Sequence, residues 1–248
     1  MSSTEPEAGA ATRAPARKPW RSQFAWLHPK TYLGIHAMVG LALAAACTWA
    51  FFAIADEVPE KGLMARGDIA ATAWLQNHGT EAGKTIFSAI SFLGAQVLIG
   101  LLVITAVALL ARRDWRRLAV LCVTCGGGAL LDVALKDSFH RARPSFASEF
   151  IRNASWSFPS GHAMNSLIVY GLLAYWISDR FPRARLVIVL SAAALAGLIG
   201  FSRIYLGVHY VSDVVAGYSA GFVWLTVCVT GFRFAERRKV GPGGPNEA

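Results

Sequence analysis

The chain has 248 residues, of which 54% are hydrophobic and 16% charged, with a net charge of +9 and a mean hydropathy of +0.43. A soluble domain has about 25% charged residues and a core too small to bury this many apolar side chains, so the composition indicates a membrane protein and excludes a disordered chain or a coiled coil. The basic residues form short clusters between long apolar stretches, which is typical of the cytoplasmic loops of membrane proteins rather than of nucleic-acid binding.

Residues 1–31 are rich in Ala, Pro, Ser and Arg and have no apolar periodicity, which predicts a disordered basic cytoplasmic tail. Six apolar stretches follow, each close to the roughly 20 residues that a helix needs to cross a bilayer. They cover residues 32–55, 85–111, 118–135, 161–178, 186–202 and 208–232. The predicted fold is therefore all-α: a polytopic membrane helix bundle with six transmembrane helices over 32–232, followed by a basic cytoplasmic tail over 233–248.

The distribution of Lys and Arg predicts the orientation in the membrane. Sixteen of the 24 basic residues lie in the two tails and in the loops after the second and fourth spans. Since basic loops remain in the cytoplasm, both termini are expected there, in a multi-pass protein of a bacterial-type inner membrane. The loops at 56–84 and 136–160 should face the exterior or periplasm, and the first should hold a short surface helix from an N-cap at Asp68 to Gly79.

Polar residues inside or beside membrane spans are costly and usually functional, and here they gather on the outward side. Three separate stretches contribute them: Lys136 and Arg143; Ser160, Gly161 and His162; and Arg203, His209 and Asp213. Taken singly, the cations could be interfacial anchors and Ser160 only a helix cap. Their convergence at one level of the membrane favours a shared site.

This set of residues suits phosphoryl transfer. Cations and the amino end of a helix bind phosphate oxygens. His209 and Asp213 are four residues apart, so they are expected on one helix face, where the carboxylate would orient the ring of a histidine nucleophile. His162 can act as the general acid. The sequence predicts metal-independent chemistry with no cofactor, because no carboxylate cluster of metal-ligand type accompanies the cations.

Three ordered motifs carry a family resemblance. Residues 136–144 read KDSFHRARP, residues 159–162 read PSGH, and residues 202–213 read SRIYLGVHYVSD. They match K-x6-R-P, P-S-G-H and S-R-x5-H-x3-D in every fixed position. The chain thereby resembles the type 2 phosphatidic acid phosphatase superfamily, the integral-membrane lipid phosphate phosphatases.

The resemblance implies a role for each matching residue. His209 would form a phosphohistidine, Asp213 would hold its ring, and His162 would protonate the leaving oxygen and then activate water. The phosphate oxygens would be bound by Lys136, Arg143, Ser160, Gly161 and Arg203. The family core is similar to that of soluble vanadium haloperoxidases, but six predicted spans argue against that activity.

The implied partners are the bilayer and a lipid phosphate, with no nucleic acid. The substrate stays open among undecaprenyl diphosphate, phosphatidate, phosphatidylglycerophosphate and a lipid A phosphate, and the oligomeric state is not predicted. Two alternatives remain: a membrane phosphotransferase that uses the same site, and a non-enzymatic transporter. A transporter would spread its ionisable groups along a path across the bilayer, whereas here they cluster at one end.

Three features lie outside the motifs. Gly217 and Gly221 form a G-x-x-x-G pattern that would let a neighbouring helix approach the sixth span closely. Asp132 lies one helical turn before Lys136, so it either pairs with that residue or is a neutral acid bonded to another helix. The loop at 145–158 has aromatic residues that either line an acyl-chain entry or anchor the loop at the interface.

Overall fold

The computed structural model describes residues 29–58 and 62–239, and the side chains of 38–58, 62–149 and 151–235. The chain divides into two units, Met1–Gly40 and Leu41–Ala248. In the first unit, the described residues belong to the beginning of helix α1 (Pro29–Glu57). The architecture and the site below concern the second unit.

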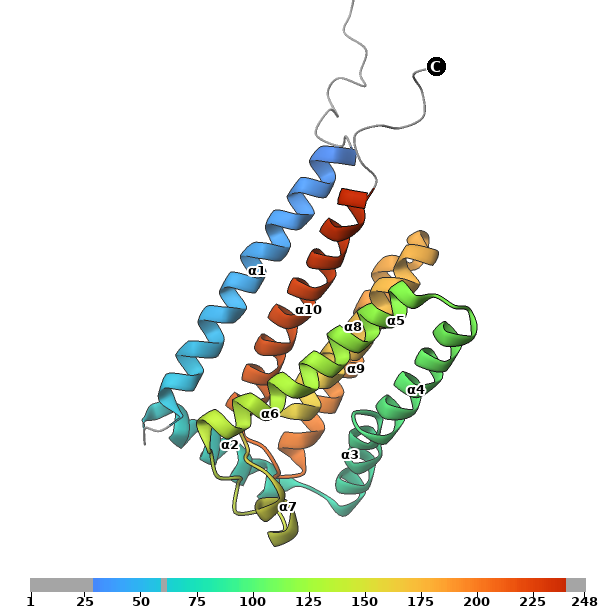
Figure 1. The fold of residues 1–248 in the computed structure, drawn as a ribbon. Helices are drawn as coiled ribbons and strands as arrows, with labels where there is room; N and C mark the ends of the chain where they lie inside the picture. Colours follow the sequence, from blue (N-terminus) through green and yellow to red (C-terminus); the bar gives the residue numbers. More distant parts are fainter. Residues whose placement is uncertain (1–28, 59–61, 240–248) are drawn as a thin grey trace, which may run out of the picture. The chain divides into compact units, whose positions relative to one another are not determined.

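The described part of the second unit is entirely helical, as the apolar stretches predict (Figure 1). After α1, its α-helices are α2 (Leu63–His78), α3 (Glu81–Leu93), α4 (Gln96–Ala111), α5 (Trp115–Leu121), α6 (Gly127–Phe139), α7 (Glu149–Ala154), α8 (Gly161–Arg180), α9 (Arg185–Tyr205) and α10 (Val211–Lys239). A π-helical turn, η2 (Cys122–Gly126), joins α5 to α6, and a 3₁₀ turn, η3 (Pro182–Ala184), precedes α9.

Five segments in the described residues are long and apolar enough to cross a membrane, against the six predicted. They are Met38–Glu57, Glu81–Ala111, Trp115–Phe139, Pro182–Tyr205 and Val211–Ala235. The stretch predicted as the fourth span is the 20-residue helix α8, which is less apolar than these five. Its residues Ser166, Ile168 and Leu172 are fully buried. A helix surrounded by protein has less need of apolar side chains than one that faces lipid.

Two predicted spans have different boundaries in the structure. The second is interrupted at Gly94 and Ala95, so that α3 and α4 are separate helices. The sixth begins at Val211 rather than at residue 208, which leaves His209 in the turn before α10. The predicted placement of His209 and Asp213 on one helix face is therefore wrong, and their pairing has another cause, given below.

Helix α8 packs closely against α10, and glycine makes this possible. A Cβ atom on Gly217 would lie 2.6 Å from the backbone oxygen of Ser160, and one on Gly221 would lie 2.9 Å from that of Met164. The predicted close approach of a neighbouring helix is thus confirmed, and the neighbour is α8. The contact places the amino end of α8 beside the first turns of α10.

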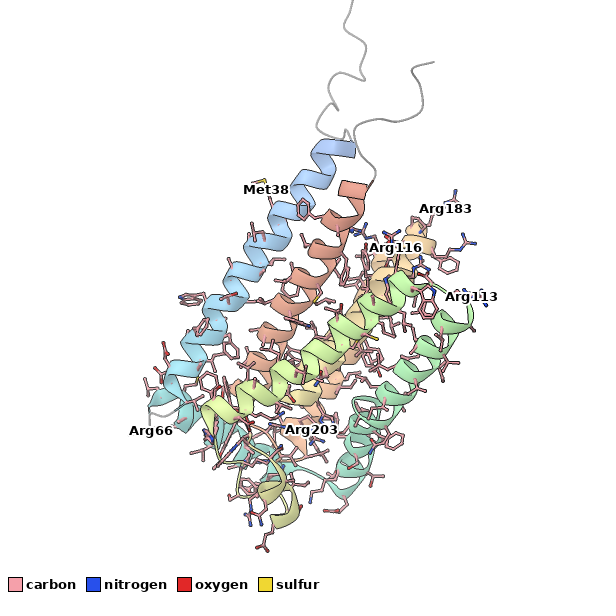
Figure 2. The ribbon with its side chains drawn as sticks, in the orientation of Figure 1. Met38, Arg66, Arg113, Arg116, Arg183 and Arg203 are labelled. Atoms are coloured by element: carbon pink, nitrogen blue, oxygen red, sulfur yellow. The ribbon has the colours of Figure 1, made fainter. Side chains whose placement is uncertain are left out.

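The two ends of the second unit carry different groups. Figure 2 shows Arg113, Arg116 and Arg183 at one end and Arg66 and Arg203 at the opposite end. The short helices α2 and α7 lie at the same end as Arg203 (Figure 1). The loops predicted to be cytoplasmic after the second and fourth spans therefore share one end, and the residues of the three motifs meet at the other.

Candidate active site

His209 is held beside Asp213 by the cap of helix α10. Tyr210 occupies the N-cap position, and the side chain of Asp213, three residues later, reaches back so that its Oδ2 accepts a hydrogen bond from the Tyr210 N–H at 2.9 Å. This is the carboxylate half of a capping box. The same Oδ2 lies 3.4 Å from His209 Nδ1, so the cap that starts the helix also positions the histidine.

The surroundings of His209 determine which ring nitrogen carries the proton. Nη1 of Arg143 lies 3.1 Å from His209 Nε2. A guanidinium only donates hydrogen bonds, so Nε2 must accept and is unprotonated. The proton therefore sits on Nδ1, which faces the Asp213 carboxylate. The free lone pair of Nε2 points toward the arginine that the sequence assigns to phosphate binding.

His209 is 2% exposed, and this burial lowers the pKa of its ring to about 4. The hydrogen bond and charge of Asp213 oppose that shift, while the charges of Arg143 and Arg203 add to it. His209 is consequently neutral at pH 7, as a nucleophile must be.

The two arginines are oriented by neighbouring helices and loops. Arg143 donates from Nε to the Ser155 backbone oxygen and from Nη2 to Ser155 Oγ, both at 2.9 Å. Burial lowers the pKa of Arg143, and the negative charges of Asp213 and Asp132 oppose this effect. Arg203, near the end of α9, donates from Nη1 to Ser91 Oγ at 2.6 Å. These contacts fix both guanidiniums close to His209, since both charges act on it.

Two buried polar atoms of the cluster have no partner. Among the described residues, four buried side-chain atoms lack a hydrogen bond, and two of them are Ser160 Oγ and Arg203 Nε. Ser160 is the N-cap residue of α8, but its side chain makes no capping bond. Its backbone N–H donates to the Asp213 backbone oxygen at 2.9 Å, which ties it to α10. Buried polar atoms without partners are rare in native proteins and fit a site for an anionic ligand.

Lys136, on α6, lies near the amino end of α8. Its Nζ lies 2.7 Å and 2.6 Å from the two carboxylate oxygens of Asp132, which confirms the predicted pair over the alternative of a neutral acid bonded to another helix. A Cβ on Gly161 would lie only 2.7 Å from that Nζ. Glycine at this position therefore lets the ammonium reach the backbone at the start of α8.

His162 follows in the first turn of α8, close enough to four other cluster residues to interact with them electrostatically: Arg203, His209, Lys136 and Arg143. The structure thus brings together all eight motif residues to which the family resemblance assigns a role. They come from α6, the loop after it, the N-cap and first turn of α8, the end of α9, the turn after α9 and the first turn of α10.

Three further residues reach this cluster and were not identified from the sequence. Ser157 donates to Asp213 Oδ2 at 2.5 Å, and Arg141 donates to Asp213 Oδ1 at 2.5 Å. Asp68 forms an ion pair with Arg141 at 2.8 Å. The prediction that Asp68 is an N-cap is wrong, because α2 already begins at Leu63 and Asp68 is buried in its middle. In the sequence, only Arg141 could have been noticed, because it is a second arginine two residues before Arg143.

The loop at 145–158 contains α7 and, among its described side chains, one buried aromatic residue. Phe158 is fully buried and packs on Phe51 and Phe139, so it lines no acyl-chain entry. Phe146 and Trp156 are exposed, and the side chain of Phe150 lies outside the described residues.

A cavity of 560 Å³ opens beside Lys136. Its polar lining comes from Lys136, Asp137, Arg152, Asn153 and Ser155. Ser155 also binds Arg143, so the cavity adjoins the residues that the sequence predicts to bind phosphate.

Comparisons with known proteins identify the family. The PAP2 superfamily model matches residues 117–237. Phosphatidylglycerophosphatase B of Bacillus subtilis is 38% identical over 152 residues, which cover 59% of this chain and 73% of that protein. A lipid A 1-phosphatase of Rhizobium johnstonii is 35% identical over 122 residues, 45% of this chain and 47% of the relative.

A solved structure extends the likeness to the fold. The crystal structure of a transmembrane PAP2 type phosphatidylglycerolphosphate phosphatase from Bacillus subtilis superposes with a TM-score of 0.69 at 29% identity, covering 81% of this chain and 98% of that one. The present chain is therefore a multi-pass, all-α integral membrane protein. Because its relatives are enzymes, the alternative of a non-enzymatic transporter is excluded. The chain belongs to the PAP2 superfamily and is a membrane lipid phosphate phosphatase.

Proposed function

We propose that this phosphatase removes the terminal phosphate of phosphatidylglycerophosphate through a phosphohistidine on His209. The observation that carries the mechanism is the orientation of this histidine. Its Nδ1 faces the Asp213 carboxylate, and its unprotonated Nε2 faces Arg143.

In the first half of the reaction, the Nε2 lone pair attacks phosphorus. The phosphorus–oxygen bond to the lipid breaks as the phosphorus–nitrogen bond forms, and His162 gives a proton to the departing oxygen. Arg143, Arg203 and Lys136 neutralise the charge that accumulates on the non-bridging oxygens. The unpartnered Ser160 Oγ and Arg203 Nε supply two further donors.

In the second half, His162 accepts a proton from water as the water oxygen attacks phosphorus. The phosphorus–nitrogen bond breaks, its electrons return to Nε2, and inorganic phosphate leaves. Asp213 keeps the Nδ1 proton in place through both halves, so the ring always presents the same nitrogen. The product is free phosphate, which distinguishes hydrolysis from transfer to an acceptor alcohol.

The cavity beside Lys136 supports the choice of substrate. In phosphatidylglycerophosphate the leaving alcohol is a glycerol that bears a second phosphate, as a diester. Arg152, Asn153 and Asp137 line the cavity, and Nη1 of Arg152 donates to the Ser145 backbone oxygen at 3.0 Å. Arg152 would bind the diester phosphate and Asp137 would accept a hydrogen bond from a glycerol hydroxyl. Phosphatidate has no group to place there.

Phosphate release from a lipid panel tests this assignment. Purified protein in detergent should favour phosphatidylglycerophosphate over phosphatidate, undecaprenyl diphosphate and a lipid A phosphate. Arg152→Ala should raise KM for phosphatidylglycerophosphate roughly tenfold, the loss of one charge-assisted hydrogen bond, and leave KM for phosphatidate unchanged. Arg66→Ala is the matched control, because Arg66 is an exposed arginine at the same end that does not line the cavity (Figure 2). Equal effects of Arg152→Ala on both lipids contradict the assignment.

The mechanism has its own test, independent of the lipid. His209→Ala should abolish turnover and the phosphoenzyme trapped by an alkaline denaturing quench, in which a phosphohistidine survives, while keeping the folded yield. Activity should persist in excess chelator, because the three cations bind the phosphate without a metal ion. A His209→Ala variant that keeps a tenth of the wild-type rate, or a chelated enzyme that magnesium restores, contradicts the proposed chemistry.

The proposal extends to topology. We assign a sixth span to α8, which at 20 residues is about 30 Å long, enough to cross the hydrocarbon core. The phosphatase domain would then occupy 32–232, between cytoplasmic tails at 1–31 and 233–248. The active site would face the exterior or periplasm, and the described residues within these tails are the ends of α1 and α10.

A further inference from the structure

A buried network outside the three motifs surrounds the carboxylate of Asp213. Arg141, in the loop after α6, donates from Nη1 to Asp213 Oδ1 at 2.5 Å and from Nη2 to Asp68 Oδ2 at 2.8 Å. The side chain of Arg141 is 11% exposed, that of Asp68 4%, and that of Asp213 0%. One guanidinium therefore bridges two buried carboxylates from helices that are far apart in the sequence.

Asp68 also holds the first turn of α10. Its Oδ1 accepts the Ser212 backbone N–H at 3.0 Å, and its Oδ2 accepts the Ser212 hydroxyl. The first backbone N–H groups of a helix have no partner within the helix, so a residue of α2 supplies one across the fold. The Arg141 guanidinium also contacts this end of α10, because it lies 4.3 Å from the centre of the Tyr210 ring.

The two carboxylate oxygens of Asp213 therefore have different partners. Oδ1 is bound by Arg141, and Oδ2 is left for Ser157, the Tyr210 N–H and His209. Burial by itself lowers the pKa of Arg141, but the neighbouring carboxylates of Asp213 and Asp68 outweigh it and raise the pKa. The guanidinium therefore stays charged at any pH at which the enzyme is assayed.

We propose that Arg141 and Asp68 are positioning residues for the nucleophile, which hold Asp213 and the first turn of α10 so that His209 keeps its proton on Nδ1 and its lone pair on Nε2. The inference rests on the proposed role of His209. Without Arg141, the full negative charge of Asp213 would act on the ring of His209 and favour its protonated form. The carboxylate would also be free to turn its other oxygen toward the ring.

The test measures the rate of phosphoenzyme formation by rapid quench into alkaline denaturant, in which a phosphohistidine survives, together with kcat, KM and their pH dependence. Arg141→Gln should slow phosphoenzyme formation about a hundredfold and leave KM within threefold, because Arg141 does not touch the substrate. The acid limb of kcat/KM should move to higher pH. Asp68→Asn, which keeps the pair between Arg141 and Asp213, should produce a smaller loss in the same direction. Arg66→Gln on α2 is the control and should behave as wild type.

The outcomes are distinguishable. A purely structural role would lower Tm and the folded yield, while the folded fraction would keep its rate and its acid limb. Folded Arg141→Gln with the wild-type rate and pH profile overturns the inference. If Arg141→Gln does not fold, Arg141→Lys decides, because lysine keeps the charge but its single nitrogen cannot occupy both Nη positions. An unchanged rate and acid limb in Arg141→Lys then overturn the inference. If the wild type itself forms no phosphoenzyme, the proposed function fails instead.

Discussion

At the scale of single residues, the site works through shared contacts. Asp213 caps α10, orients His209 and anchors Ser160 through its backbone oxygen. Arg143 reaches both the histidine and the loop that lines the cavity. Because one group serves several neighbours, replacing it alters the protonation and position of others as well as its own contact.

The low pKa of His209 gives a prediction for the pH dependence. In the proposed mechanism the ring attacks only when it is unprotonated. A pKa of about 4 keeps it unprotonated down to about pH 5, whereas an ordinary histidine is half protonated near pH 6.5. The acid limb of kcat/KM that belongs to the enzyme should therefore lie near pH 4. Substrate ionisation adds a second limb near pH 6 for a phosphomonoester. A limb that stays fixed when the monoester is exchanged for a diphosphate belongs to the enzyme, and a fixed limb near 6.5 contradicts the prediction.

The pair between Asp132 and Lys136 gives a second prediction. Both carboxylate oxygens contact Nζ, and a Cβ placed on Gly161 would meet both side chains, so the carboxylate aims the ammonium at the amino end of α8. Asp132→Asn should lower kcat/KM roughly tenfold, about 1.4 kcal/mol of transition-state stabilisation, with little change in folded yield. Adding this change to Lys136→Ala should cost almost nothing more, because the two act as a unit. Fully additive losses in the double variant would show that they act separately.

At the scale of helices, the sequence predicts the apolar segments better than their interruptions. Spans of about 20 apolar residues follow from the thickness of the bilayer, and five of the six appear as candidate spans. The break at Gly94, the π-helical turn at Cys122 and the start of α10 at Val211 depend on packing between helices, which no periodicity along one stretch reveals. The ion pair of Asp68 with Arg141, 73 residues away, is invisible for the same reason.

The contact between α8 and α10 gives a prediction at this scale. A methyl group on Gly217 would lie 2.6 Å from the Ser160 backbone oxygen, and a backbone atom cannot swing aside as a side chain can. Gly217→Ala should destabilise the protein by about 1–3 kcal/mol, the usual range for overpacking, and should lower kcat by separating Ser160 from His209. Gly231→Ala on the same helix is the matched control, because nothing lies within 4 Å of its added methyl. Thermal unfolding in detergent and phosphate release measure the two effects, and equal behaviour of both variants contradicts the packing argument.

At the scale of the whole molecule, the motifs identify the site because they are ordered and complete, while its surroundings come from the fold. All eight motif residues with an implied role meet at one end of the second unit, as their placement at the ends of predicted spans implies. The residues that the sequence did not reveal, Asp68, Arg141 and Ser157, contact Asp213 or its helix from other segments. The family motifs contain the residues predicted to contact the phosphate, whereas the residues that support them depend on the tertiary arrangement of the chain.

The segregation of basic loops predicts which end of the second unit faces the cytoplasm. Arg113, Arg116 and Arg183 share the end opposite Arg203 (Figure 2), and basic loops stay on the cytoplasmic side, so the active site should face outward. Two exposed alanines allow a test with little disturbance: Ala154 at the end of α7, and Ala184 in the turn before α9. In an active variant whose four native cysteines are replaced, Ala154→Cys should react with a membrane-impermeant maleimide in intact spheroplasts. Ala184→Cys should react only after the cells are lysed. The reverse labelling would place the site in the cytoplasm, where the enzyme would meet only lipid phosphates of the inner leaflet.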